Sequence, residues 1–151
     1  MTSAPAADCV FCRIVAGDKP DQPLVYEDEH TAAFIDPRQV TPGHTLVVPK
    51  AHVRDLFELD DASAAALMPA VARIAGAVRR AFACEGISLW QQNGAAAGQE
   101  VFHLHIHVMP RHGGDGLLRI YPSWPSFPSV EERAEMALRL RSELDPSLRS
   151  G

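Results

Sequence analysis

The sequence predicts an α+β fold, in which an antiparallel sheet is covered on one face by packed helices. Two observations support this prediction. Short stretches rich in β-branched and aromatic residues alternate with longer stretches of helical periodicity, in the order strands, helix, strands, helix. The chain has 151 residues, 46% of them hydrophobic, which is enough for one domain with a single core.

The first strands are expected at residues 24–27, 31–36 and 45–49, because turn residues separate these stretches. A helix then begins at Asp60 or Asp61, either of which is a good N-cap. Gly86 is expected to end this helix, and Pro69 to kink or divide it. Its apolar residues recur at helical spacing: Leu67, Val71, Ile74, Val78 and Phe82.

Two more strands are expected at residues 87–92 and 99–109, joined by a glycine-bounded loop and stopped by Pro110. The chain thus divides into a domain at 8–115, an irregular linker at 116–128 that contains three prolines, and a C-terminal helix at 129–145 packed on or extending the domain. A capping box at 129–132 supports the start of that helix.

Charge and composition restrict the partners. Fourteen basic and nineteen acidic residues give a formal charge of −5, which disfavours a polymeric nucleic acid or an anionic membrane surface as a partner. No signal peptide is evident, and no apolar run approaches the roughly 20 residues that cross a bilayer, so we expect a cytoplasmic protein. Its three cysteines do not indicate a disulfide framework, but Cys9 and Cys12 form a Cys-x-x-Cys pair that could bind metal.

Three histidines carry the strongest functional signal. His103, His105 and His107 alternate with apolar residues, so in a strand all three imidazoles lie on one face. A solvated surface strand is one alternative. A shared metal ion is another, but the outer two would be about 13 Å apart along the strand, too far to bind one ion.

A neutral imidazole can attack phosphorus at pH 7 without a metal. The loop at 92–99 precedes the histidines and offers carboxamides, including Asn93, together with glycine backbone as donors for phosphoryl oxygens. Such a loop could also be a simple hairpin connection.

In its three alternating histidines and the loop before them, the sequence resembles the histidine triad (HIT) family. The resemblance extends over about residues 8–115 and includes the histidine strand together with stretches at 9–17, 25–28, 33–36, 42–50 and 93–111. It implies an α+β fold that forms a homodimer. It also implies that His105 is the nucleophile, that His103 and His107 flank it, and that His44 is a fourth active-site histidine.

The resemblance further assigns the substrate and metal sites. Asp36 would accept hydrogen bonds from the ribose, Phe34 and Ile35 would line the base pocket, and Gln92, Gln99 and the Gly98 backbone would contact the phosphate. A structural zinc ion, not required for catalysis, would be bound by Cys9, Cys12, His52 and His103. In that case His103 is structural and not a catalytic acid; without zinc, the cysteines are ordinary reduced thiols.

The function implied by the resemblance is hydrolysis, or nucleotidyl transfer, that releases a purine nucleoside monophosphate from a phosphoramidate-like leaving group through a covalent nucleotidyl-histidine. Cleavage of dinucleoside polyphosphates by hydrolysis or phosphorolysis is a second possibility, and a non-catalytic nucleotide-binding module is a third. The physiological leaving group and the base preference stay open at this point.

Overall fold

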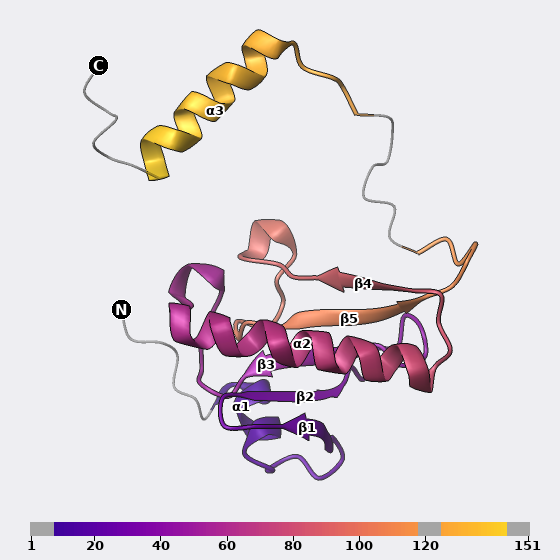
Figure 1. Ribbon diagram of the computed structural model, residues 1–151. Helices are drawn as coiled ribbons and strands as arrows, with labels where there is room; N and C mark the ends of the chain where they lie inside the picture. Colours follow the sequence, from indigo (N-terminus) through magenta and orange to yellow (C-terminus); the bar gives the residue numbers. More distant parts are fainter. Residues whose placement is uncertain (1–7, 118–124, 145–151) are drawn as a thin grey trace. The chain divides into compact units, whose positions relative to one another are not determined.

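The computed structural model describes residues 8–117 and 125–144, and the chain divides into two units, residues 1–115 and 116–151. The first unit holds the sheet and two α-helices (Figure 1). Its elements, with two short 3₁₀ turns, are α1 (Val10–Val15), β1 (Leu24–Glu27), β2 (Thr31–Ile35), β3 (Thr45–Pro49), η2 (Leu56–Glu58), α2 (Asp61–Ala81), β4 (Gly86–Trp90), η3 (Ala95–Ala97) and β5 (Ile106–Arg111).

The five strands form one antiparallel sheet in the order β1-β2-β3-β5-β4. The last strand in sequence is therefore inserted between β3 and β4. His107 of β5 pairs with Leu46 on one side and with Trp90 on the other. This central position brings the histidine segment next to residues from the first half of the chain.

Helix α2 covers one face of the sheet, as expected. Asp60 is its N-cap and accepts a hydrogen bond from the backbone N–H of Ser63 at 2.7 Å. Its buried residues pack against alternate residues of β2, β3 and β5: Leu67, Ala70, Val71, Ile74 and Val78 contact a cluster that includes Ala33, Val47, Ile106 and Val108. The packing follows the two periodicities seen in the sequence.

One local expectation about α2 was wrong, and one of the two alternatives at Pro69 is excluded. The helix ends at Ala81 and not near Gly86, because Ala83 adopts a left-handed conformation with φ of 47° and Gly86 already pairs with Arg111 in β4. Pro69 does not divide the helix, which runs continuously through this exposed position.

The prediction that helices cover only one face was also wrong. Phe11 and Ile14 of α1 pack on the opposite face, in a second cluster with Ala32, Phe34, Leu46 and Val48. Consecutive residues of a strand point to opposite faces, so Ala33 faces α2 while Phe34 faces α1. This second face contains the candidate site.

The strand that carries the histidines is shorter than expected at its start and longer at its end. β5 begins at Ile106, and the backbone N–H of Leu104 instead donates to the Val53 carbonyl at 2.6 Å, outside the sheet. Pro110 does not stop the strand, because β3 pairs only as far as Val108 and the missing N–H is not needed on that side.

The second unit contains α3 (Val130–Leu144). The expected capping box is present, since Ser129 N–H donates to Glu132 at 2.7 Å and Glu132 N–H donates to the Ser129 hydroxyl at 3.1 Å. None of the α3 residues is buried within the described part of the chain. Most of the expected linker, residues 118–124, lies outside the described residues.

One helix, α2, is long and apolar enough by length and composition to cross a membrane, with a mean hydropathy of 1.2. The same helix packs its buried stripe against the sheet, and core helices commonly have this composition. The arrangement in the first unit therefore accounts for its apolar character.

Candidate active site

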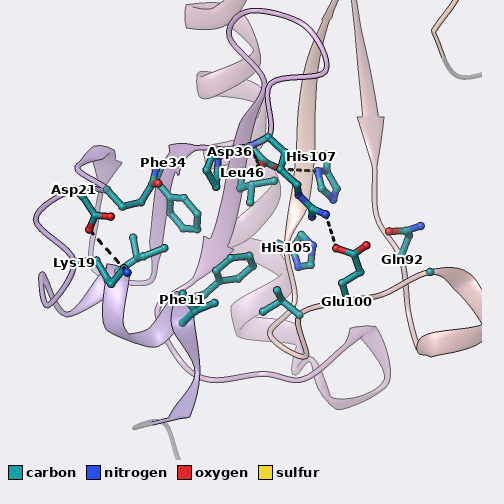
Figure 2. A pocket seen from close by; sticks show the side chains of 17 residues that line it. Phe11, Lys19, Asp21, Phe34, Asp36, Leu46, Gln92, Glu100, His105 and His107 are labelled. Carbon is teal, nitrogen blue, oxygen red and sulfur yellow. Dashed lines mark hydrogen bonds and ion pairs between the residues drawn. The ribbon is translucent and has the colours of Figure 1, made fainter.

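A pocket of about 560 Å³ lies on the α1 face of the sheet, within the usual range for small-ligand sites (Figure 2). Apolar side chains from α1, β2 and β3 line one part of it, including Phe11, Phe34 and Leu46. Polar groups converge at the other part, among them Asp36, Gln92, His105 and His107. The pocket thus combines an apolar slot, suited to a planar base, with a polar end.

The geometry fixes the tautomer of His105. Its Nδ1 lies 2.7 Å from the carbonyl oxygen of His103, and a carbonyl can only accept, so Nδ1 carries the proton. Nε2 is then the atom with a free lone pair. Burial lowers the pKa of His105, whose side chain is 8% exposed, so the ring is neutral at pH 7 and nucleophilic.

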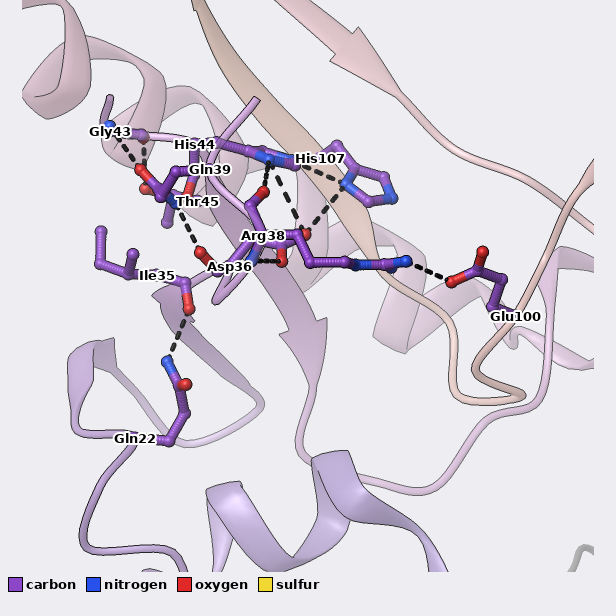
Figure 3. Close-up of polar contacts among 10 residues, drawn as sticks. All are labelled: Gln22, Ile35, Asp36, Arg38, Gln39, Gly43, His44, Thr45, Glu100 and His107. Atoms are coloured by element: carbon purple, nitrogen blue, oxygen red, sulfur yellow. Dashed lines mark hydrogen bonds and ion pairs between the residues drawn. The ribbon is translucent and has the colours of Figure 1, made fainter. Parts of the chain in front are cut away.

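A chain of polar contacts runs from the Arg38 carbonyl through His44 to His107 (Figure 3). His44 donates from Nδ1 to the Arg38 carbonyl at 3.2 Å, and its Nε2 lies 2.8 Å from Nδ1 of His107. The two rings stack with centroids 5.0 Å apart. Burial, reinforced by the neighbouring imidazoles, lowers the pKa of His107 to about 4, so His107 is neutral at pH 7, and its contact with His44 orients its ring.

Asp36 is a buried carboxylate at the end of β2, with 3% exposure. Its Oδ1 accepts the backbone N–H of Arg38 at 2.8 Å, which fixes the side chain. Its Oδ2 lies 3.7 Å from His44 and 3.9 Å from His107, beyond hydrogen-bond range. This oxygen is therefore the one available to a ligand hydroxyl in the pocket.

Of the residues expected to contact a phosphate, Gln92 and Gly98 line the pocket. Gly98 has a φ of +86°, and a Cβ at this position would lie 2.6 Å from Nε2 of Gln92. The backbone conformation therefore favours glycine here, and a larger residue would also displace the end of the Gln92 side chain.

Three residues expected to bind substrate are directed elsewhere. Asn93 accepts the backbone N–H of Leu56 at 2.8 Å and so holds the loop in place. Gln99 is 4% exposed and bonds the backbone of Gly94 and Arg54. The side chain of Ile35 does not line the described pocket, and its carbonyl accepts a hydrogen bond from Gln22.

The four expected metal ligands do come together. The ligand atoms of Cys9, Cys12, His52 and His103 all lie within 4.8 Å of one another, so the cluster could hold a metal ion. The S···N distances of 3.3 to 3.5 Å agree with the roughly 3.5 Å expected between ligands of a tetrahedral zinc ion. His103 donates from Nε2 to the Pro49 carbonyl at 2.8 Å, which leaves Nδ1 unprotonated and directed at the cysteines.

Electrostatics also favours a cation at this cluster. Burial, a hydrogen bond of the Cys12 thiol to Cys9 and repulsion by Cys9 raise the pKa of Cys12 to about 11, so the thiolate form requires a compensating positive charge. His103, whose pKa burial lowers to about 4, is neutral and suited to ligation. The histidines therefore serve two neighbouring sites and not one row of equivalent groups.

Several pocket residues were not anticipated from the sequence. Phe11 contacts the His105 ring with centroids 5.1 Å apart, and Arg38 and Glu100 meet near the histidines. Lys19 lies at the far end of the pocket. The apolar periodicity of the short α1 could have indicated Phe11, but the isolated charged residues carry no local signal.

Comparison with known proteins places this geometry in context. The sequence model of the HIT domain family matches residues 18–114 of this chain. "Protein hit" of Bacillus subtilis is 50% identical over 112 residues, which is 74% of this chain and 77% of the relative. The adenosine 5′-monophosphoramidase hnt1 of Schizosaccharomyces pombe is 36% identical over 137 residues, covering 90% of this chain and 98% of the relative.

Two further similarities bear on the chemistry. The adenylylsulfatase HINT3 of Arabidopsis thaliana is 40% identical over 110 residues, covering 73% of this chain and 55% of the relative. A crystal structure of a zinc-bound histidine triad family protein from Mycobacterium smegmatis matches with a TM-score of 0.69 and 38% identity, over 94% of this chain and 99% of that one.

Proposed function

This chain belongs to the HIT family, and from that premise we propose that it cleaves purine nucleoside 5′-monophosphates from a phosphoramidate-like leaving group through a nucleotidyl-His105 intermediate. The observation that carries the proposal is the hydrogen bond from His105 Nδ1 to the His103 carbonyl, which leaves Nε2 as a nucleophile in the pocket. The names of two relatives, a monophosphoramidase and an adenylylsulfatase, support this class of reaction.

In the first step, Nε2 of His105 attacks the α-phosphorus and forms a P–N bond. The bond from phosphorus to the leaving group breaks, and the leaving group keeps the electron pair; an amine leaving group also takes up a proton from solvent water. The imidazole then carries a positive charge, because Nδ1 keeps its hydrogen. The His103 carbonyl, at 2.7 Å, stabilises that charge.

In the second step, water attacks phosphorus, the P–N bond breaks, and the nucleoside monophosphate leaves with His105 restored. Gln92 and the backbone at Gly98 line the pocket where donors to the phosphoryl oxygens are required. Asp36 Oδ2 would accept from a ribose hydroxyl, while Phe11, Phe34 and Leu46 enclose the base.

We further propose that the bound metal is zinc and that Cys9, Cys12, His52 and His103 hold it. The ion would crosslink α1 to the loop after β3 and to the histidine segment, which is a structural role. Each step above is carried by the imidazole and the pocket donors. The zinc-bound structure from Mycobacterium smegmatis supports this assignment.

The assembly and location are also proposals. We propose a homodimer, because β4 is an edge strand of the described sheet and its Leu89 is 47% exposed. Sedimentation of the purified chain tests this. We propose a cytoplasmic protein, as expected from the sequence, which fractionation of cells would test.

The covalent step is tested by quenching the enzyme in acid-free denaturant during turnover of adenosine 5′-phosphoramidate. Mass spectrometry should find one nucleotidyl group on the peptide that contains His105, and none in the His105→Asn variant. Product formed by His105→Asn at the wild-type rate would contradict the mechanism.

A further inference from the structure

Two exposed residues of opposite charge meet beside the candidate nucleophile. Arg38, in the loop between β2 and β3, places its Nη1 2.6 Å from the carboxylate of Glu100, which precedes the histidine segment. Both side chains line the pocket together with His105 and His107. Figure 2 shows Glu100 near the two histidines, and Figure 3 shows Arg38 with Glu100 and His107. The resemblance and the comparisons assign no role to either residue.

The backbone of Arg38 is fixed by the site itself. Its N–H donates to Asp36 at 2.8 Å, and its carbonyl accepts from His44 at 3.2 Å. The guanidinium therefore extends from a rigid base, while the side chain is 68% exposed. Arg38 can thus move its charge within the pocket opening without disturbing Asp36 or His44.

The partner of Arg38 is easily exchanged. The side chains of Arg38 and Glu100 are 68% and 67% exposed, and exposed ion pairs contribute little to stability. Both side chains nevertheless line the same pocket as His105. The pair is therefore close to the reacting atoms but is not required to hold the fold together.

The geometry of the displacement at phosphorus indicates that the leaving group lies near Arg38 and Glu100. In-line displacement places the leaving group on the side of phosphorus opposite to His105. His105 is buried, so this side is the open part of the pocket. Of the charged side chains that line the pocket, Lys19 and Asp21 lie at the opposite end in Figure 2, whereas Glu100 lies near His105 and His107. Arg38 is at this same end, because it pairs with Glu100 at 2.6 Å.

We propose that Arg38 binds the leaving group of substrates whose leaving group is an oxyanion, such as sulfate or a phosphate chain, and that Glu100 occupies the guanidinium until such a substrate displaces it. This inference rests on the proposed function. The P–O bond breaks, its electron pair goes to the departing oxygen, and Arg38 pairs with that charge. An amine leaving group gains no such pairing.

The test compares two substrates that share the same nucleotide, adenosine 5′-phosphosulfate and adenosine 5′-phosphoramidate. Arg38→Gln should lower kcat/KM for the phosphosulfate about 10- to 100-fold more than for the phosphoramidate, as expected for loss of a hydrogen bond between charged groups. Arg38→Lys should recover part of that loss. Glu100→Gln should raise kcat/KM for the phosphosulfate a few-fold, mainly through KM, because the competing carboxylate is gone.

Lys50→Gln is the matched control, since Lys50 forms an ion pair with Glu27 at 2.8 Å but does not line the pocket. It should leave the ratio of the two substrates unchanged. An unchanged ratio in Arg38→Gln, or a lower phosphosulfate rate in Glu100→Gln, would overturn the inference. If either of these results is found but the wild-type chain still forms nucleotidyl-His105, only the role of Arg38 is refuted and the proposed function is retained. If the wild-type chain forms no nucleotidyl-His105 with either substrate, the proposed function is refuted as well.

Discussion

Replacing Asp36 by asparagine tests whether its carboxylate binds the ribose of the substrate. The substitution keeps the shape of the side chain and an acceptor for the backbone N–H of Arg38, so the loop after β2 is preserved. It removes the negative charge from Oδ2, the oxygen that lies 3.7 Å or more from the nearby imidazoles. The substitution therefore changes the strength of a ligand hydrogen bond more than the fold.

The expected size of the effect follows from the single available oxygen. A hydrogen bond to a charged group contributes about 1.5–3 kcal/mol, and one between neutral groups about 0.5–1.5 kcal/mol. The wild-type enzyme should therefore prefer a ribonucleotide over its 2′-deoxy analogue by about 10- to 150-fold in kcat/KM. In Asp36→Asn the preference should fall to about 2- to 10-fold.

The test measures kcat/KM for the ribonucleotide and for its 2′-deoxy analogue, each with the wild-type enzyme and with Asp36→Asn. Asp21→Asn removes another carboxylate that lines the same pocket, and it should leave the sugar preference at the wild-type value. Equal preference in the wild type and in Asp36→Asn, with unchanged melting temperatures, would show that Asp36 does not bind the ribose. The 3′-deoxy analogue then identifies which hydroxyl is involved.

Four further predictions concern the other parts of the site. His105→Ala should reduce kcat by at least about a thousandfold while calorimetry finds nucleoside monophosphate binding largely intact, and a variant that keeps a tenth or more of the rate would exclude covalent histidine chemistry. Elemental analysis should find about one zinc per chain, and Cys9→Ser combined with Cys12→Ser should lower both zinc content and melting temperature. Wild-type turnover at neutral pH should persist in chelator; activity that added metal promptly restores without a change in fold would instead indicate a metal hydrolase. Gly98→Ala should lose activity because its Cβ displaces Gln92. Gly94→Ala, with a φ of +85°, a ψ of 159° and no atom within 4 Å of the added Cβ, should be destabilised at least as strongly but keep its activity in the folded protein.

Local periodicity was enough to predict much of the fold. The stripe on α2 and the alternation around His105 depend on residues two to four positions apart, and both patterns are present in the structure. The end of α2 and the start of β5 were misjudged because they depend on distant partners. Gly86 belongs to β4 because it pairs with Arg111, and the Leu104 N–H lies outside the sheet because it donates to the Val53 carbonyl.

The site was predicted less completely, for the same reason. The family resemblance identified residues that the structure brings together, such as Asp36, His44 and His107. It did not distinguish Gln92, which lines the pocket, from Asn93 and Gln99, which bond the backbone of neighbouring loops. Carboxamides serve either role equally well, so only the folded loop decides between them.

The histidine segment has a consequence for how this gene can vary. Residues at even positions, Leu104, Ile106 and Val108, belong to the apolar cluster under α2, while the odd positions face the thiols and the pocket of the candidate site. Phenotypes should therefore alternate along the segment, with loss of solubility at one position and loss of activity in a folded chain at the next. Deleting one codon here would exchange the two faces, directing imidazoles into the core and leucine into the pocket. Substitutions can damage one property at a time, but an in-frame deletion damages both at once.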